Sequence, residues 1–209
     1  ISSGGTLVNA ARASAGFAVL VPLGTSGAVA GDQAELRRGS ASFPSPLLRT
    51  LTATDIIFGS AVFALEHGQL GGDGAKEISA RVTDSAGIIG AASAVLSLIL
   101  DTTCPTLASA KITGSNQATF SYSESVFSAT TDYANLTLSG GDVRTVLSAT
   151  GSSTATILLS FGGIAVATNA TGTIAIGNTV TDSAGNALSA TTTMLTDGQS
   201  PTAAVSYSK

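Results

Sequence analysis

The sequence predicts an all-β chain of two tandem Greek-key β-sandwiches, followed by the first strand of a further module. One six-residue segment, Val-Thr-Asp-Ser-Ala-Gly, occurs twice, at residues 82–87 and 180–185. Each copy is followed by a segment that starts with aspartate and ends with Pro-Thr, at residues 101–106 and 197–202. A repeat spacing of about one hundred residues matches the size of one β-sandwich module.

The composition agrees with two small β domains. The 209 residues are enough for two domains that each bury a core. Only 11% of the residues are charged and 44% are hydrophobic. A disordered chain instead combines low hydrophobicity with a high net charge. The formal net charge is −4, and the largest basic cluster is the pair Arg37 and Arg38. No nucleic-acid partner is therefore expected.

In the first module, alternating apolar and polar residues predict the strands. Pro22 places the first of them at a sheet edge or at a strand end. Residues 7–15 tolerate a helix but stop at Gly16, so they predict a single turn or an irregular segment rather than a stable helix. The residues expected to face inward are Phe17, Val19, Val21, Leu36, Ile78, Ala80, Val82, Ala94, Leu96, Leu98 and Leu100.

The second module follows the same pattern, and a strand within residues 188–195 closes it. Its inward residues are expected to be Ala118, Phe120, Tyr122, Leu136, Leu138, Ala155, Ile157, Leu159, Phe161, Ile174 and Ile176. Residues 203–207 then predict one more strand, which must find a pairing partner. The expected boundaries are module one at 1–101, a junction at 102–106, module two at 107–197, and at 198–209 a linker with the start of a further module or a donor strand.

Several short motifs together resemble a known class of module. They are Asn-Ala-Ala at 9–11, Ala-Gly-Asp at 30–32, Gly-Asp-Gly at 72–74, Phe-Ser-Tyr-Ser-Glu-Ser-Val at 120–126, and the two turn segments. The combination resembles the bacterial Ig-like repeat modules of large cell-surface adhesins, biofilm proteins and surface-layer proteins. The chain departs from that pattern at Ile88, where asparagine is usual, and at Cys104, where alanine is usual.

This resemblance implies Ig-like sandwiches at the cell surface or outside the cell, serving as a stalk, spacer or lattice module without chemistry of their own. The implied partners are neighbouring Ig-like modules or copies of the same chain, with a surface receptor or glycan as a further partner. No membrane insertion is expected, because the most apolar stretch, residues 87–100, is too short to span a bilayer.

Aspartates in glycine-rich turns and at the junction are the best candidates for a site. Calcium binds carboxylate and carbonyl oxygens on flexible loops, and the resemblance implies calcium at module junctions. The default interpretation is that these aspartates cap turns through backbone hydrogen bonds. The metal hypothesis is strongest at Asp101 and also covers Asp32, Asp73, Asp84, Asp182 and Asp197.

The remaining reactive residues do not predict an enzyme. His67 is the only histidine, it is expected in a loop, and no Gly-x-Ser-x-Gly segment accompanies it. Cys104 excludes an internal disulfide and is expected to be a partly buried linker residue. Glycines 71–74 predict a turn rather than a phosphate site, because no helix pattern or lysine follows. Glu124 and Asp142 have no acidic partner that the sequence can place.

Two other functions stay open. A self-assembling filament or surface-layer subunit would exchange strands between copies, using residues 203–207 as a donor. A carbohydrate-binding sandwich would need exposed aromatic residues, for which only Tyr122, Tyr133 and Tyr207 are available because the chain has no tryptophan. Asn135 and Asn169 stand in N-glycosylation sequons, whose use depends on the organism.

Overall fold

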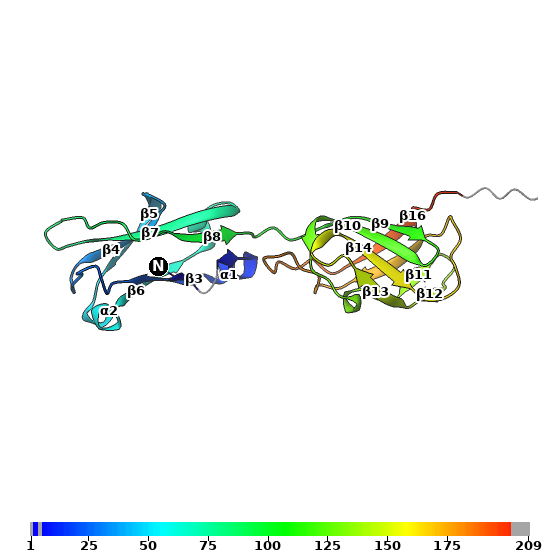
Figure 1. Ribbon diagram of the computed structural model, residues 1–209, viewed down its shortest axis with the longest axis horizontal. Coiled ribbons are helices and arrows are strands. Elements are labelled where there is room, and N and C mark those ends of the chain that lie inside the picture. Colours follow the sequence, from blue (N-terminus) through cyan, green and yellow to red (C-terminus); the bar gives the residue numbers. More distant parts are fainter. Residues whose placement is uncertain (1, 4–5, 202–209) are drawn as a thin grey trace, which may run out of the picture. The chain divides into compact units, whose positions relative to one another are not determined.

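The computed structural model describes residues 2, 3 and 6–201, apart from the side chains of Ser2, Ser3 and His67. The chain is mostly β and forms several sheets, so the all-β prediction is confirmed. It divides into two compact units, Ile1–Thr103 and Cys104–Lys209, and Figure 1 labels many of their elements. The strand predicted at residues 203–207 lies outside the described residues.

The first unit packs a three-stranded sheet, β1-β3-β6, against a five-stranded sheet, β2-β8-β7-β4-β5. All neighbouring strands are antiparallel except β2 and β8. The strands are β1 (Ser2–Ser3), β2 (Leu7–Val8), β3 (Phe17–Pro22), β4 (Gln33–Arg38), β5 (Ala41–Thr50), β6 (Ser60–Leu65), β7 (Gly74–Thr83) and β8 (Leu96–Leu100).

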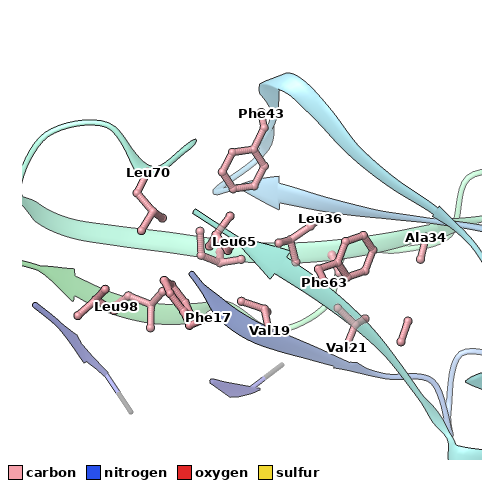
Figure 2. Packing of buried hydrophobic residues seen from close by; sticks show 14 of the residues in the cluster. Phe17, Val19, Val21, Ala34, Leu36, Phe43, Phe63, Leu65, Leu70 and Leu98 are labelled. Carbon is pink, nitrogen blue, oxygen red and sulfur yellow. The ribbon is translucent and has the colours of Figure 1, made fainter. Parts of the chain in front are cut away.

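The core of the first unit lies between these two sheets. Figure 2 shows Val19 and Val21 of β3 on the same side of their strand, near Leu36 of β4 and Phe63 of β6. The inward faces predicted for residues 17–21, 36, 78–80 and 98–100 are buried. Val82 and Leu96 are partly buried against the same core. Ala94, which was expected in the closing strand, precedes β8.

Short helices connect the strands, and the sequence did not predict them. They are α1 (Ala10–Ala15), α2 (Ala53–Phe58) and α3 (His67–Leu70). The sequence predicted a single turn or an irregular segment before Gly16, and the structure has the six-residue helix α1 there. Asn9 caps this helix by accepting a hydrogen bond from the Arg12 amide at 2.9 Å, and Ala13 packs into the core. The expectation that His67 lies in a loop was wrong, since it begins α3.

The second unit forms one continuous eight-stranded sheet, β12-β11-β15-β16-β9-β10-β14-β13, folded around its own core. Its closing strand begins at Thr191 rather than at residue 188, and it pairs with β15 and, in parallel, with β9. The elements are β9 (Leu107–Gly114), β10 (Gln117–Val126), the 3₁₀ helix η1 (Thr130–Asp132), β11 (Leu136–Leu138), β12 (Val143–Arg144), β13 (Val146–Thr150), β14 (Thr154–Phe161), β15 (Gly172–Ile176) and β16 (Thr191–Asp197).

The predicted inward faces of the second unit are buried, except that Ala155 is only partly buried. Phe120 lies at the centre of this core with no exposed surface, and its ring centroid is 5.6 Å from that of Tyr133. The two-residue periodicity of β10, β14 and β15 therefore identified the core face correctly.

Candidate functional site

The repeated six-residue segment forms the same closed turn in both units. Asp84 accepts hydrogen bonds from the amides of Ala86 at 2.9 Å and Ile88 at 2.8 Å. Asp182 accepts the equivalent bonds from Ala184 and Asn186, both at 2.8 Å. The glycine of each turn has a positive φ, 84° at Gly87 and 88° at Gly185, which L-residues rarely adopt. Turn capping is therefore a role that both aspartates perform.

The two copies differ at the residue after the glycine. In the second unit the Asn186 side-chain amide donates to Asp182 Oδ2 at 2.7 Å, and both residues are buried. In the first unit the same position holds Ile88, which is 68% exposed. The second turn is thus closed by an extra side-chain hydrogen bond, whereas the first presents an apolar side chain to solvent.

Asp101, which follows β8, and Asp197, which ends β16, also have matching contacts. The Thr103 amide donates to Asp101 Oδ1 at 3.3 Å, and the Gln199 amide donates to Asp197 Oδ1 at 2.9 Å. Asp32 accepts a hydrogen bond from the Val29 amide at 2.9 Å in the loop between β3 and β4. These local hydrogen bonds agree with the interpretation that the aspartates cap turns.

Asp73 has a different role, because it fixes the end of the first unit. Its Oδ2 accepts the Thr102 amide at 3.0 Å and the Thr103 hydroxyl at 2.8 Å, while Oδ1 accepts the Thr102 hydroxyl at 2.8 Å. One carboxylate at the start of β7 therefore holds the segment that follows β8. The sequence did not predict this contact, because the partners are separated by 29 and 30 positions.

Two pairs of acidic residues come together within single units. Asp32 and Asp84 line the same hollow of about 520 Å³ between the β3–β4 and β7–β8 loops of the first unit. In the second unit, carboxylate oxygens of Glu124 and Asp182 lie within 4.8 Å of one another. Sequence reasoning missed the Glu124 pairing, because the bridge between Phe127 and Thr181, which joins the segment after β10 to the turn after β15, connects distant parts of the chain.

Two close carboxylates repel each other and provide oxygen ligands of the kind that calcium prefers. Among the described residues of either unit alone, no three acidic, histidine or cysteine side chains gather within 4.8 Å. Calcium binding at Asp101 and at the other five aspartates therefore stays a prediction.

The tyrosines of the carbohydrate hypothesis and Cys104 differ in their exposure to solvent. Tyr122 and Tyr133 are buried, and their hydroxyls lie 3.0 Å apart. Burial is the main cause that raises the pKa of both tyrosines above the ordinary value. Because Tyr122 and Tyr133 are buried, neither can stack on a sugar, and neither supports the carbohydrate hypothesis. Tyr207 lies outside the described residues. Cys104 is exposed rather than partly buried.

Comparisons with known proteins identify no family. No family model matches the chain, and no curated protein matches it. A solved structure of the fibronectin(III)-like modules of Clostridium thermocellum CbhA is similar with a TM-score of 0.36 and 12% identity, covering 100% of this chain and 99% of that one. A likeness at this score decides nothing about fold or function. In the described part of the chain, no helix has the length and apolarity to cross a membrane.

Proposed function

We propose that the two units are tandem Ig-like modules of an extracellular or cell-surface stalk, and that their task is mechanical. The observation that carries the proposal is that, in each unit, a strand near the start pairs in parallel with the last strand. These pairs are β2 with β8 in the first unit and β9 with β16 in the second. The repeated turn supports the same interpretation, because it closes both units with identical backbone contacts.

The parallel pair of strands in each unit determines how that unit responds to tension. Pulling the chain by its two ends drags the two strands of each parallel pair in opposite directions along their own axes. Their hydrogen bonds are then sheared together rather than opened one at a time. In the first unit these bonds run from the Ile99 amide to the Thr6 carbonyl at 2.8 Å and from the Asp101 amide to the Val8 carbonyl at 3.0 Å.

Stretching single molecules tests the proposal. The intact chain is expected to unfold in two events, each lengthening it by about 300 Å, because some ninety extended residues span about that distance. Ile99→Pro removes the amide that donates to the Thr6 carbonyl. It should leave the hydrogen bonds between β8 and β7 in place. It should lower the force of one event and leave the other unchanged.

Ile99→Ala is the matched control, because it retains the amide and removes a side chain that is 50% exposed. It should leave both forces at their original values. A single unfolding event, or equal forces for Ile99→Pro and the original chain, would contradict the mechanical role. No catalytic step belongs to this proposal.

Two further roles accompany the stalk as hypotheses. Adhesion to a surface receptor or glycan follows only from the sequence resemblance. Assembly of copies through exposed strands is the second candidate function, and one observation favours it. The edge strand β6 has no proline, no charged residue and no register shift, which are features that usually prevent edge pairing.

A further inference from the structure

Strand β6 forms an open edge of the three-stranded sheet. Its only strand partner among the described residues is β3, with six consecutive residue pairs and no register shift. In the second unit the sheet β9-β10-β14 continues to a further strand, β13. Among the described residues of the first unit, no strand pairs with β6 on the side away from β3.

The antiparallel ladder determines which backbone groups face this edge. The Leu23 amide donates to the Gly59 carbonyl at 2.8 Å, so Leu23 and Gly59 form a hydrogen-bonded pair. Paired residues alternate between bonded and non-bonded positions along an antiparallel ladder. Ser60, Val62 and Ala64 therefore occupy non-bonded positions towards β3, and their N–H and C=O groups point to the open edge.

The other sheet edges have protecting features in their length, sequence or pairing that β6 lacks. Natural edges are protected by shortness, proline, bulges or charge. Strands β1, β2 and β12 have two residues each. Strand β5 contains Pro44, Pro46 and a register shift in its pairing with β4, and β13 has a register shift in its pairing with β14. Strand β6, Ser-Ala-Val-Phe-Ala-Leu, has six residues and none of these features.

The outer face beside this edge is also apolar. Leu20 is paired with Val62 and Ala18 with Ala64, and all four side chains are exposed. Leu20 is 39% exposed and Val62 is 45% exposed. An antiparallel sheet usually presents polar residues on its solvent side. Strands β3 and β6 contain no charged residue, although the chain carries a net charge of −4.

We propose that β6 pairs with β6 of a second copy of this chain, in antiparallel orientation about a two-fold axis at Val62. Three open residues spaced symmetrically around Val62 make the edge complementary to itself. Val62 then faces Val62 of the second copy, and Ser60 faces Ala64, which gives about six hydrogen bonds between the copies. Because β3 and β6 are uncharged, two negatively charged chains meet here without like charges in contact.

This inference gives the self-assembly candidate a defined surface and does not depend on the mechanical role. Its test uses the full chain with Cys104→Ser, so that one introduced cysteine is the only thiol. Bonded antiparallel partners have Cα atoms about 5.5 Å apart, which suits a disulfide. Val62→Cys should form a covalent dimer under mild oxidation at least about tenfold faster than a control cysteine, because pairing raises the effective thiol concentration.

Leu20→Cys is the matched control, on the same face and of similar exposure. Three strand spacings would separate Leu20 from its copy by about 14 Å, beyond the reach of a disulfide. Equal crosslinking at positions 20 and 62, or none at 62, would overturn the proposal. Loss of the Val62→Cys crosslink in a chain shortened to residues 1–201 would also overturn it, in favour of strand donation by residues 203–207.

Val62→Lys gives a second measurement without a disulfide. A charge on the edge blocks strand addition, and an exposed position should tolerate lysine without loss of folding. The original chain is expected to show a concentration-dependent dimer by sedimentation, and Val62→Lys to remain monomeric with an unchanged melting temperature. A dimer that persists in Val62→Lys would refute pairing through β6.

Discussion

Asp55 shows how one side chain holds a local structure together. Its Oδ2 accepts hydrogen bonds at 2.8 Å from both the amide and the hydroxyl of Thr52, and Thr52 caps α2 in return. Arg49 of β5 pairs with Oδ1 at 2.7 Å. The hydrogen bond from Arg49, followed by those from Thr52, lowers the pKa of Asp55 from 3.8 to about 2.

The lowered pKa of Asp55 predicts an acid-sensitive contribution to stability. A carboxyl group whose pKa is depressed on folding stabilises the protein fully above its unfolded pKa and less as pH falls through the folded one. This contribution should therefore be present above pH 3.8 and decline towards pH 2. Asp55→Asn should lower the melting temperature at pH 7 and flatten its dependence on pH within that window.

Thr52→Ala is the matched control for this prediction. It should cost about 1 kcal/mol through loss of the helix cap, yet keep much of the acid dependence, because the pair with Arg49 remains. Thermal unfolding from pH 2 to 7 distinguishes the two variants. An Asp55→Asn chain with the original pH profile would show that Asp55 does not titrate in this window.

Residue contacts differ in how far the sequence foretells them. The Thr52-x-x-Asp55 spacing is a known capping signature, so α2 could have been predicted from it and was overlooked. The contact of Glu124 with Asp182 has no such signal, because 58 positions separate the two residues and only the folded second unit brings them together. Local hydrogen bonds can be predicted from the sequence, whereas contacts between distant strands require the topology.

At the scale of elements, Gly151 controls the hairpin between β13 and β14. Its φ is +99°, and a Cβ added there would overlap the carbonyl oxygen of Thr156. Gly140 has a similar φ of +104° but has open space around the added atom. Both alanine variants should lose about 1 kcal/mol or more from backbone strain, and Gly151→Ala should lose more because of the overlap.

Chemical denaturation of both variants separates strain from overlap. The extra loss in Gly151→Ala measures what the Thr156 carbonyl costs when the hairpin has to shift. Equal losses in the two variants would mean that the hairpin adjusts freely and that only the backbone conformation matters.

The buried faces of β3 and β10 were predicted from the sequence, whereas β6 was not predicted at all. Residues 118–122 alternate clearly, and their apolar members are buried. Strand β6 was missed, because Val62 and Ala64 on its outer side hide the alternation with Ala61 and Phe63. The feature that concealed this strand from the sequence analysis is the same apolar outer face on which the proposed pairing depends.

At the scale of the whole molecule, the same six-residue turn recurs in each of the two compact units. Both units contain the same turn, and in both a strand near the start pairs in parallel with the last strand. Sequence alone located the turn, because six identical residues recur. It did not locate the parallel pairs, since each is only two residues long and joins segments from opposite ends of a unit.

Calcium provides the last test of the aspartates, and it acts on the stability of the whole chain. A ligand that binds only the folded state at about 100 times its Kd adds roughly 2.7 kcal/mol. If the sequence prediction holds, millimolar calcium should raise the melting temperature relative to chelator, and Asp101→Ala should remove the increase.

Glu124→Gln distinguishes calcium bound at Asp101 from calcium bound at the Glu124–Asp182 pair as the cause of a higher melting temperature. It removes one charge from the pair in the second unit and leaves Asp101 intact, so an increase that survives it belongs to the junction aspartate. An increase abolished by Glu124→Gln and retained by Asp101→Ala would place the ion at the Glu124–Asp182 pair instead. Equal melting temperatures with calcium and with chelator would leave these aspartates with hydrogen bonding as their role, in which Asp73 holds Thr102 and Thr103 and the others cap their own turns.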